Sequence, residues 1–114
     1  MTGRTGKADG SGTVRLLPWA RPDGRPCYVV GDGTGYVSRM ADRVESIQLG
    51  MADDLLGHAD DLLAERRVTG GELHYLASRL AESLRDVKRV AESRGARLAQ
   101  VTGQGPEAHV PERR

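Results

Sequence analysis

The chain has 114 residues and a net charge of only +1, and its composition combines 38% apolar with 29% charged residues. This length allows one domain with a marginal core, and because Phe is absent, burial must rely on aliphatic side chains. The sequence contains neither a secretory signal nor an apolar membrane span, and the single Cys27 cannot form an internal disulfide, so we expect a soluble cytoplasmic protein.

The two ends are rich in Gly and polar residues. We expect a disordered leader at residues 1–12, a single small domain at 13–95 and a flexible tail at 96–114.

The first expected element is a β-hairpin. Two short apolar runs, 14–19 and 27–30, flank Pro22-Asp23-Gly24, in which Pro presets φ and Gly supplies a positive φ for a turn. An isolated hairpin is barely stable in water, so this one should pack on helices, with Trp19 and Tyr28 as its anchors.

A Gly-rich segment, GDGTGY at 31–36, follows the hairpin and precedes a helix. A phosphate-binding loop has this placement, but Tyr36 replaces the third glycine of a dinucleotide fingerprint and no Lys-Ser/Thr follows. We therefore interpret the segment as a turn in which Asp32 or Thr34 caps the next helix.

The first helix is expected at about 36–67, where apolar residues recur at spacings of three and four. One stripe contains Val37, Met40, Val44, Ile47, Met51, Leu55, His58 and Leu62. A second ridge, displaced by roughly 100°, contains Leu49, Leu56 and Leu63, and alanines fill the arc between the two. Such a wide apolar surface exceeds what one neighbouring helix covers.

The second helix is expected at about 70–94. Thr69 and Glu72 have the spacing of a capping box, and Gly95 is a natural stop. The short connection predicts an antiparallel helical hairpin. The expected apolar stripe contains Leu73, Leu76, Leu80, Leu84, Val87 and Ala91. The predicted fold is thus α+β, mostly α, with a β-hairpin packed on two antiparallel helices.

Few residues suggest chemistry. Asp54, His58 and Asp61 share a helix face and could hold a divalent metal, but no matching ligands are expected from the second helix, which favours a solvated acidic face. Cys27 has no histidine near it in sequence. We expect no enzyme, no catalytic or metal-binding residues, no cofactor and no small-molecule substrate.

Two further features each allow two interpretations. A basic cluster on the second helix, Arg85, Lys88, Arg89 and Arg94, could contact nucleic acid together with the leader, although acidic residues interleave it. Gly50 and Gly57 lie inside the first helix, where either another backbone approaches closely or nothing touches them.

The segments LLPW, CYVVGDGTGYVSRMADRVESIQLGMADDLLGHADDLL and LHYLASRLAESLRDVKRVAESRGARL resemble small uncharacterised proteins of high-GC actinomycetes, Streptomyces-like in their Arg, Ala and Gly usage. The resemblance covers about residues 14–98. It implies no known activity, so no functional residue follows from it.

The second ridge leads to the functional hypothesis. Either the β-hairpin covers Leu49, Leu56 and Leu63 within a monomer, or a second copy covers them in a four-helix bundle. We expect a protein-interaction or regulatory adaptor that forms a homodimer or binds another protein through these leucines, with no membrane partner. The alternative is a nucleic-acid-associated transcriptional regulator that uses the second helix and the basic leader.

Overall fold

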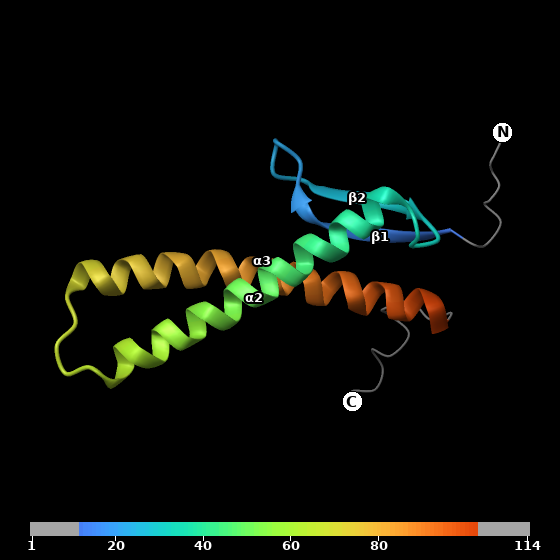
Figure 1. Cartoon of the computed structure of the whole chain (residues 1–114). Coiled ribbons are helices and arrows are strands. Elements are labelled where there is room, and N and C mark those ends of the chain that lie inside the picture. The colour runs from blue at the N-terminus through green and yellow to red at the C-terminus, as the bar shows by residue number, and fades with distance from the viewer. Residues whose placement is uncertain (1–11, 103–114) are drawn as a thin grey trace, which may run out of the picture.

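The computed structural model describes residues 12–102, and these form a β-hairpin and a helical hairpin (Figure 1). The strands are β1 (Thr13–Ala20) and β2 (Pro26–Gly31), and the helices are α2 (Tyr36–Ala64) and α3 (Gly70–Thr102). The predicted mostly helical α+β fold is confirmed. Except for Gly12, the expected leader lies outside the described residues, as does the expected tail from residue 103 onward.

The β-hairpin closes at the predicted turn. The Gly24 amide donates to the Arg21 carbonyl at 2.8 Å, the Arg21 amide donates to the Arg25 carbonyl at 2.8 Å, and Gly24 has a φ of 86°. A residue with a Cβ is strained at such a φ, so glycine is required there. The strands are antiparallel, with Arg15 opposite Val29, and the register shifts between Leu16 and Ala20.

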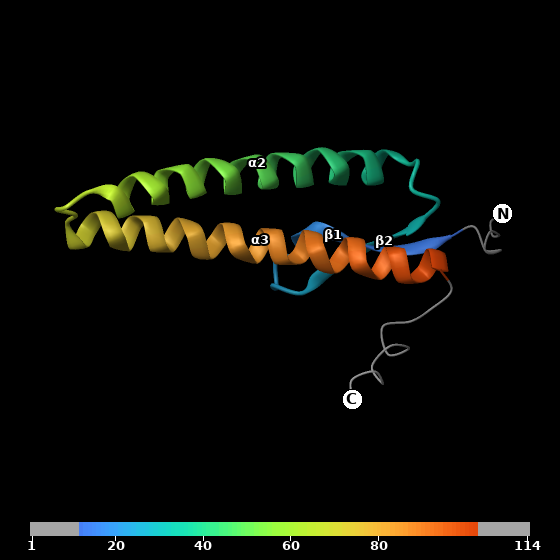
Figure 2. The ribbon, with the colours of Figure 1, turned by 90° about the horizontal axis from the view of Figure 1, so that it is seen from below.

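The helical hairpin begins its second arm with the predicted capping box. The Glu72 amide donates to the Thr69 hydroxyl at 3.0 Å, and the Thr69 amide donates to the Glu72 carboxylate at 2.9 Å. This reciprocal pair satisfies two amides that a helix start leaves unpaired. The first arm, α2, ends at Ala64, so five residues connect the two arms. Figure 2 shows α2 in one layer, with α3 and the β-hairpin together in the other.

The second helix does not stop at Gly95, contrary to the sequence prediction. α3 continues to Thr102, so its 33 residues span about 50 Å and include part of the segment expected to be a tail. The cause is tertiary: beyond Gly95 the Gln100 side chain makes two hydrogen bonds to the Val14 backbone of β1, and these contacts outweigh the roughly 1 kcal/mol that a helical glycine costs.

Helix side chains cover the outer edge of β1. Every second carbonyl accepts from one of them: Val14 from Gln100 at 2.8 Å, Leu16 from Ser93 at 2.8 Å, and Pro18 from Gln48 and Arg89 at 3.0 and 3.3 Å. Gln100 also accepts from the Val14 amide at 3.0 Å, as a neighbouring strand would. This pairing protects an edge that would otherwise attract another chain.

The helices pack only in part through the residues predicted. On α2 the buried positions are Ser38, Ala41, Glu45 and Leu62, and on α3 they are Leu76, Ser83, Val90 and Ser93. Leu62 and Leu76 belong to the predicted stripes, but the other buried positions do not, and small residues such as Ala41 allow close approach between the helices. Leu73 and Leu84, which were expected in the seam, are exposed.

The described core is small and unusually polar. Its buried apolar residues are Leu17, Ala41, Leu62, Leu76 and Val90, while the largest fully buried side chains are Glu45 and Ser93. No helix within residues 12–102 combines the length and apolarity that crossing a membrane requires.

Candidate interaction surface

A groove with an almost entirely apolar lining lies along one side of the helical hairpin. Ala52 and Leu56 of α2 form one wall, and Leu80, Leu84 and Val87 of α3 form the other, with Ser83 between them. We call this feature the apolar groove. It encloses a hollow of about 180 Å³. Leu63 and Leu73 lie seven residues from Leu56 and Leu80, respectively, so they continue the two walls toward the connection.

The predicted ridge forms only one wall of this groove. Leu56 is 58% exposed and Leu63 is 81% exposed, while Leu49 is half-buried. The β-hairpin therefore leaves Leu56 and Leu63 largely uncovered within this chain. Sequence reasoning missed the second wall, because Leu80, Leu84 and Val87 were assigned to the seam between the helices.

The expected anchors of the hairpin have different roles. Trp19 is half-buried, but Tyr28 is 58% exposed, so its prediction as an anchor is wrong. The side chains that fix β1 to the helices are instead Leu17, which is buried, and Arg15, which is 4% exposed. Tyr28 lies on the opposite face of the sheet from Arg15, because its partner in the register is Leu16.

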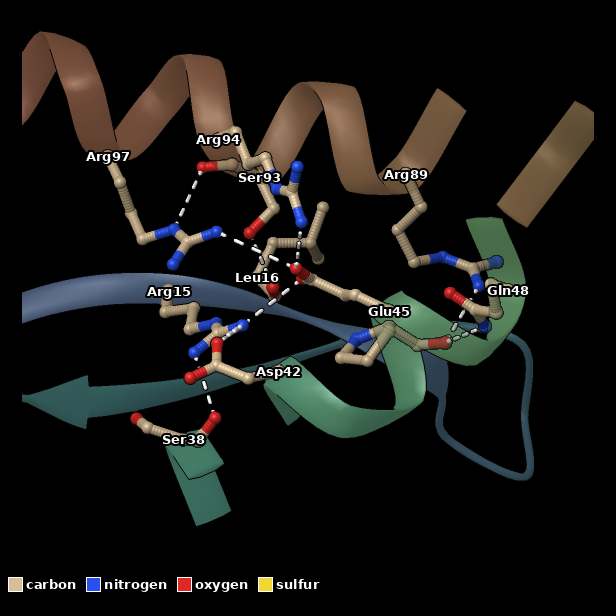
Figure 3. A network of polar contacts seen from close by, with 11 residues as sticks. Arg15, Leu16, Ser38, Asp42, Glu45, Gln48, Arg89, Ser93, Arg94 and Arg97 are labelled. Atoms are coloured by element: carbon tan, nitrogen blue, oxygen red, sulfur yellow. Dashed lines mark hydrogen bonds and ion pairs between the residues drawn. The ribbon is translucent and has the colours of Figure 1, made fainter. Parts of the chain in front are cut away.

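A network of charges centred on the buried Arg15 and Glu45 joins β1 to both helices (Figure 3). The Arg15 guanidinium lies 2.8 Å from the Asp42 carboxylate and 3.2 Å from that of Glu45, and it donates to the Ser38 carbonyl at 3.0 Å. From α3, Arg94 approaches Glu45 at 3.4 Å. Arg97 lies 3.9 Å from the same carboxylate. The Glu45 carboxylate therefore pairs with three arginine side chains.

This network holds the hairpin in place and carries no evident reactive group. Burial and the nearby Arg15 charge lower the pKa of Arg97, while Glu45 and Asp42 oppose this shift. An arginine stays protonated at any physiological pH, so Arg97 acts as a fixed charge. Sequence reasoning missed Arg15 and Glu45. The alternation of β1, which places Arg15 on the same face as Leu17, is the signal that could have found the first.

The residues considered for metal binding do not form a cluster of metal ligands within the described part of the chain. Asp54, His58 and Asp61 are exposed, and within residues 12–102 no cluster of three or more potential metal ligands is found.

The Gly-rich loop forms a local turn. The Asp32 carboxylate accepts from the Thr34 hydroxyl at 2.7 Å and from its amide at 3.0 Å, and these bonds lower the pKa of Asp32. The prediction that Asp32 or Thr34 caps α2 is wrong, because Gly35 occupies the cap position and makes no side-chain cap bond. An ionised carboxylate inside the loop disfavours phosphate.

The basic cluster of α3 is largely engaged in ion pairs. Lys88 lies 2.8 Å from Glu92, and Arg94 reaches the buried Glu45. Arg89 lies 3.5 Å from Asp86 and binds the Pro18 carbonyl. These contacts leave a mixed surface, which differs from the unbroken basic stripe typical of nucleic-acid binding.

Comparison with protein-family models, curated proteins and solved structures finds no match for this chain.

Proposed function

We propose that this chain is a small cytoplasmic interaction or regulatory adaptor that self-associates through the apolar groove. The observation that carries the proposal is the exposure of Leu56, Leu63 and Leu84, at 58%, 81% and 67%. Scattered exposed leucines are ordinary, but Leu56 of α2 and Leu84 of α3 line one hollow, and Leu63 continues the α2 wall seven residues beyond Leu56.

The thin core supports the same proposal. Burying a leucine side chain stabilises a protein by roughly 1.5–3 kcal/mol, so covering several groove leucines adds substantially to a fold with few buried apolar residues. Two helical hairpins that share their grooves form a four-helix bundle, a common and stable arrangement. The half-buried Leu49 contributes to the edge of this contact.

Charge placed in the groove tests the proposal. Leu56→Asp combined with Leu63→Asp should convert a dimer into a monomer, measured by light scattering coupled to size exclusion, while circular dichroism shows unchanged helix content. Ile47→Asp is the matched control, because Ile47 is a 56% exposed apolar residue of α2 that does not line the groove. Retention of the dimer by the double variant would place the contact elsewhere.

A further inference from the structure

The charges beside the apolar groove differ in sign between its two walls. On α2, Asp53 follows Ala52 and lies three residues before Leu56, so it borders the groove on that wall, and Asp60 borders it about two turns further along. On α3, Lys88 lies four residues after Leu84 and Arg85 directly follows it. The α2 rim is therefore acidic, while the α3 rim carries Arg85 and Lys88 near its middle, with Glu92 paired to Lys88 one turn beyond.

A symmetric dimer of two helical hairpins packed face to face has two simple geometries. A two-fold axis parallel to the helices places α2 of one copy over α3 of the other. A two-fold axis perpendicular to them places α2 over α2, and α3 over α3. Both bury the same groove, so the leucines alone do not choose between them.

The positions of the charged residues along the helix axes distinguish the two dimer geometries. Ala52 and Leu56 lie level with Leu80, Leu84 and Val87, because together they line one hollow. A parallel two-fold axis preserves height, so Asp53 of one copy meets Arg85 and Lys88 of the second. A perpendicular axis through the groove instead brings Asp53 toward Asp60 of the second copy, and like charges at such contacts oppose association.

We infer that the partner in the apolar groove is a second copy of this chain, docked with α2 against α3 of its partner and oriented by Asp53 opposite Arg85 and Lys88. This inference rests on the proposed self-association and adds its geometry. Lys88 is available for the contact because its pair with Glu92 is solvent-exposed, and exposed pairs contribute little.

Charge reversal and its rescue test the geometry. Asp53→Lys and Lys88→Asp should each raise the dimer dissociation constant about tenfold, because every substitution acts twice in a symmetric dimer, and the double reversal should restore it. Sedimentation equilibrium measures these constants. Asp54→Lys is the matched control, since it changes the same charge on the neighbouring position, away from the groove, and should leave the constant unchanged.

The possible results separate two failures. A dimer that Asp53→Lys strengthens, or that the double reversal fails to restore, overturns the docking geometry while leaving self-association intact. A wild-type chain that stays monomeric at every concentration overturns self-association itself, and the geometry with it.

Discussion

At the scale of single residues, the fold depends on a charge pair where most small domains have apolar side chains. Arg15 and Glu45 are almost completely buried and 3.2 Å apart. A buried ion pair adds little net stability compared with apolar replacements, but removing one partner leaves the other charged and unpaired. The pair therefore positions β1 on the helices more than it stabilises the chain.

Glu45→Ala should consequently be among the most damaging substitutions. We expect a loss of about 3–5 kcal/mol in the free energy of unfolding, because Arg15 would remain buried without its buried carboxylate partner and with only the exposed Asp42 beside it. The control is Asp42→Ala, which removes another Arg15 partner that is 63% exposed, and should cost below about 1 kcal/mol. Urea denaturation measures both. Equal losses would show that Glu45 is no more important than a surface carboxylate.

The capping box gives a residue-scale pH dependence. Bonds from Thr69 lower the pKa of Glu72 in the folded chain. A lowered folded pKa means that the stabilisation is complete above the unfolded value of about 4.3 and is lost as pH falls through the folded pKa. Glu72→Gln should therefore lower the melting temperature at neutral pH, and the difference from wild type should shrink below pH 4. A difference that grows with acidity would contradict this assignment.

Charged residues were also where the sequence was least informative. No sequence pattern singled out Arg15 or Glu45, because isolated charges are almost never buried. Only the contacts between β1, α2 and α3 make their burial possible, and these contacts join residues 23 or more positions apart in the chain. The Thr69–Glu72 pair was predictable because a capping box is a local feature.

At the scale of elements, periodicity and turn residues correctly predicted both hairpins. The buried faces of the helices and the end of α3 differed from the prediction. Small residues determined part of the faces: Ala41 is fully buried between the two ridges, while Leu56 and Leu63 of the second ridge remain exposed. The helix end differed because Gln100 pairs with the β1 backbone, and a distant contact of this kind leaves no local sequence signal.

The glycines of α2 provide a test at this scale. Nothing lies within 4 Å of a Cβ added at Gly50 or Gly57. Replacing both by Ala should raise the free energy of unfolding by about 1 kcal/mol each, because alanine favours helix. Gly24→Ala, where φ is positive, should destabilise the chain under the same measurement. A loss of stability in the α2 double variant would indicate that another backbone packs there.

At the scale of the whole molecule, one adhesive surface is covered within the chain and another is left exposed. The β1 edge is covered by side chains of the same chain, while the apolar groove is left open along two long helices. The leucine repeat of α2 predicted one wall of this groove, and the arrangement of α3 supplies the other. The proposed self-association follows from the groove leucines that remain exposed after the chain has folded.

The most direct measurement is the molar mass of the unmodified chain in solution, determined by light scattering across a range of concentrations. We expect a mass that approaches twice the 12.3 kDa of one chain as the concentration rises. A mass that stays at 12.3 kDa at all concentrations, with the groove leucines still exposed, would contradict the proposed self-association.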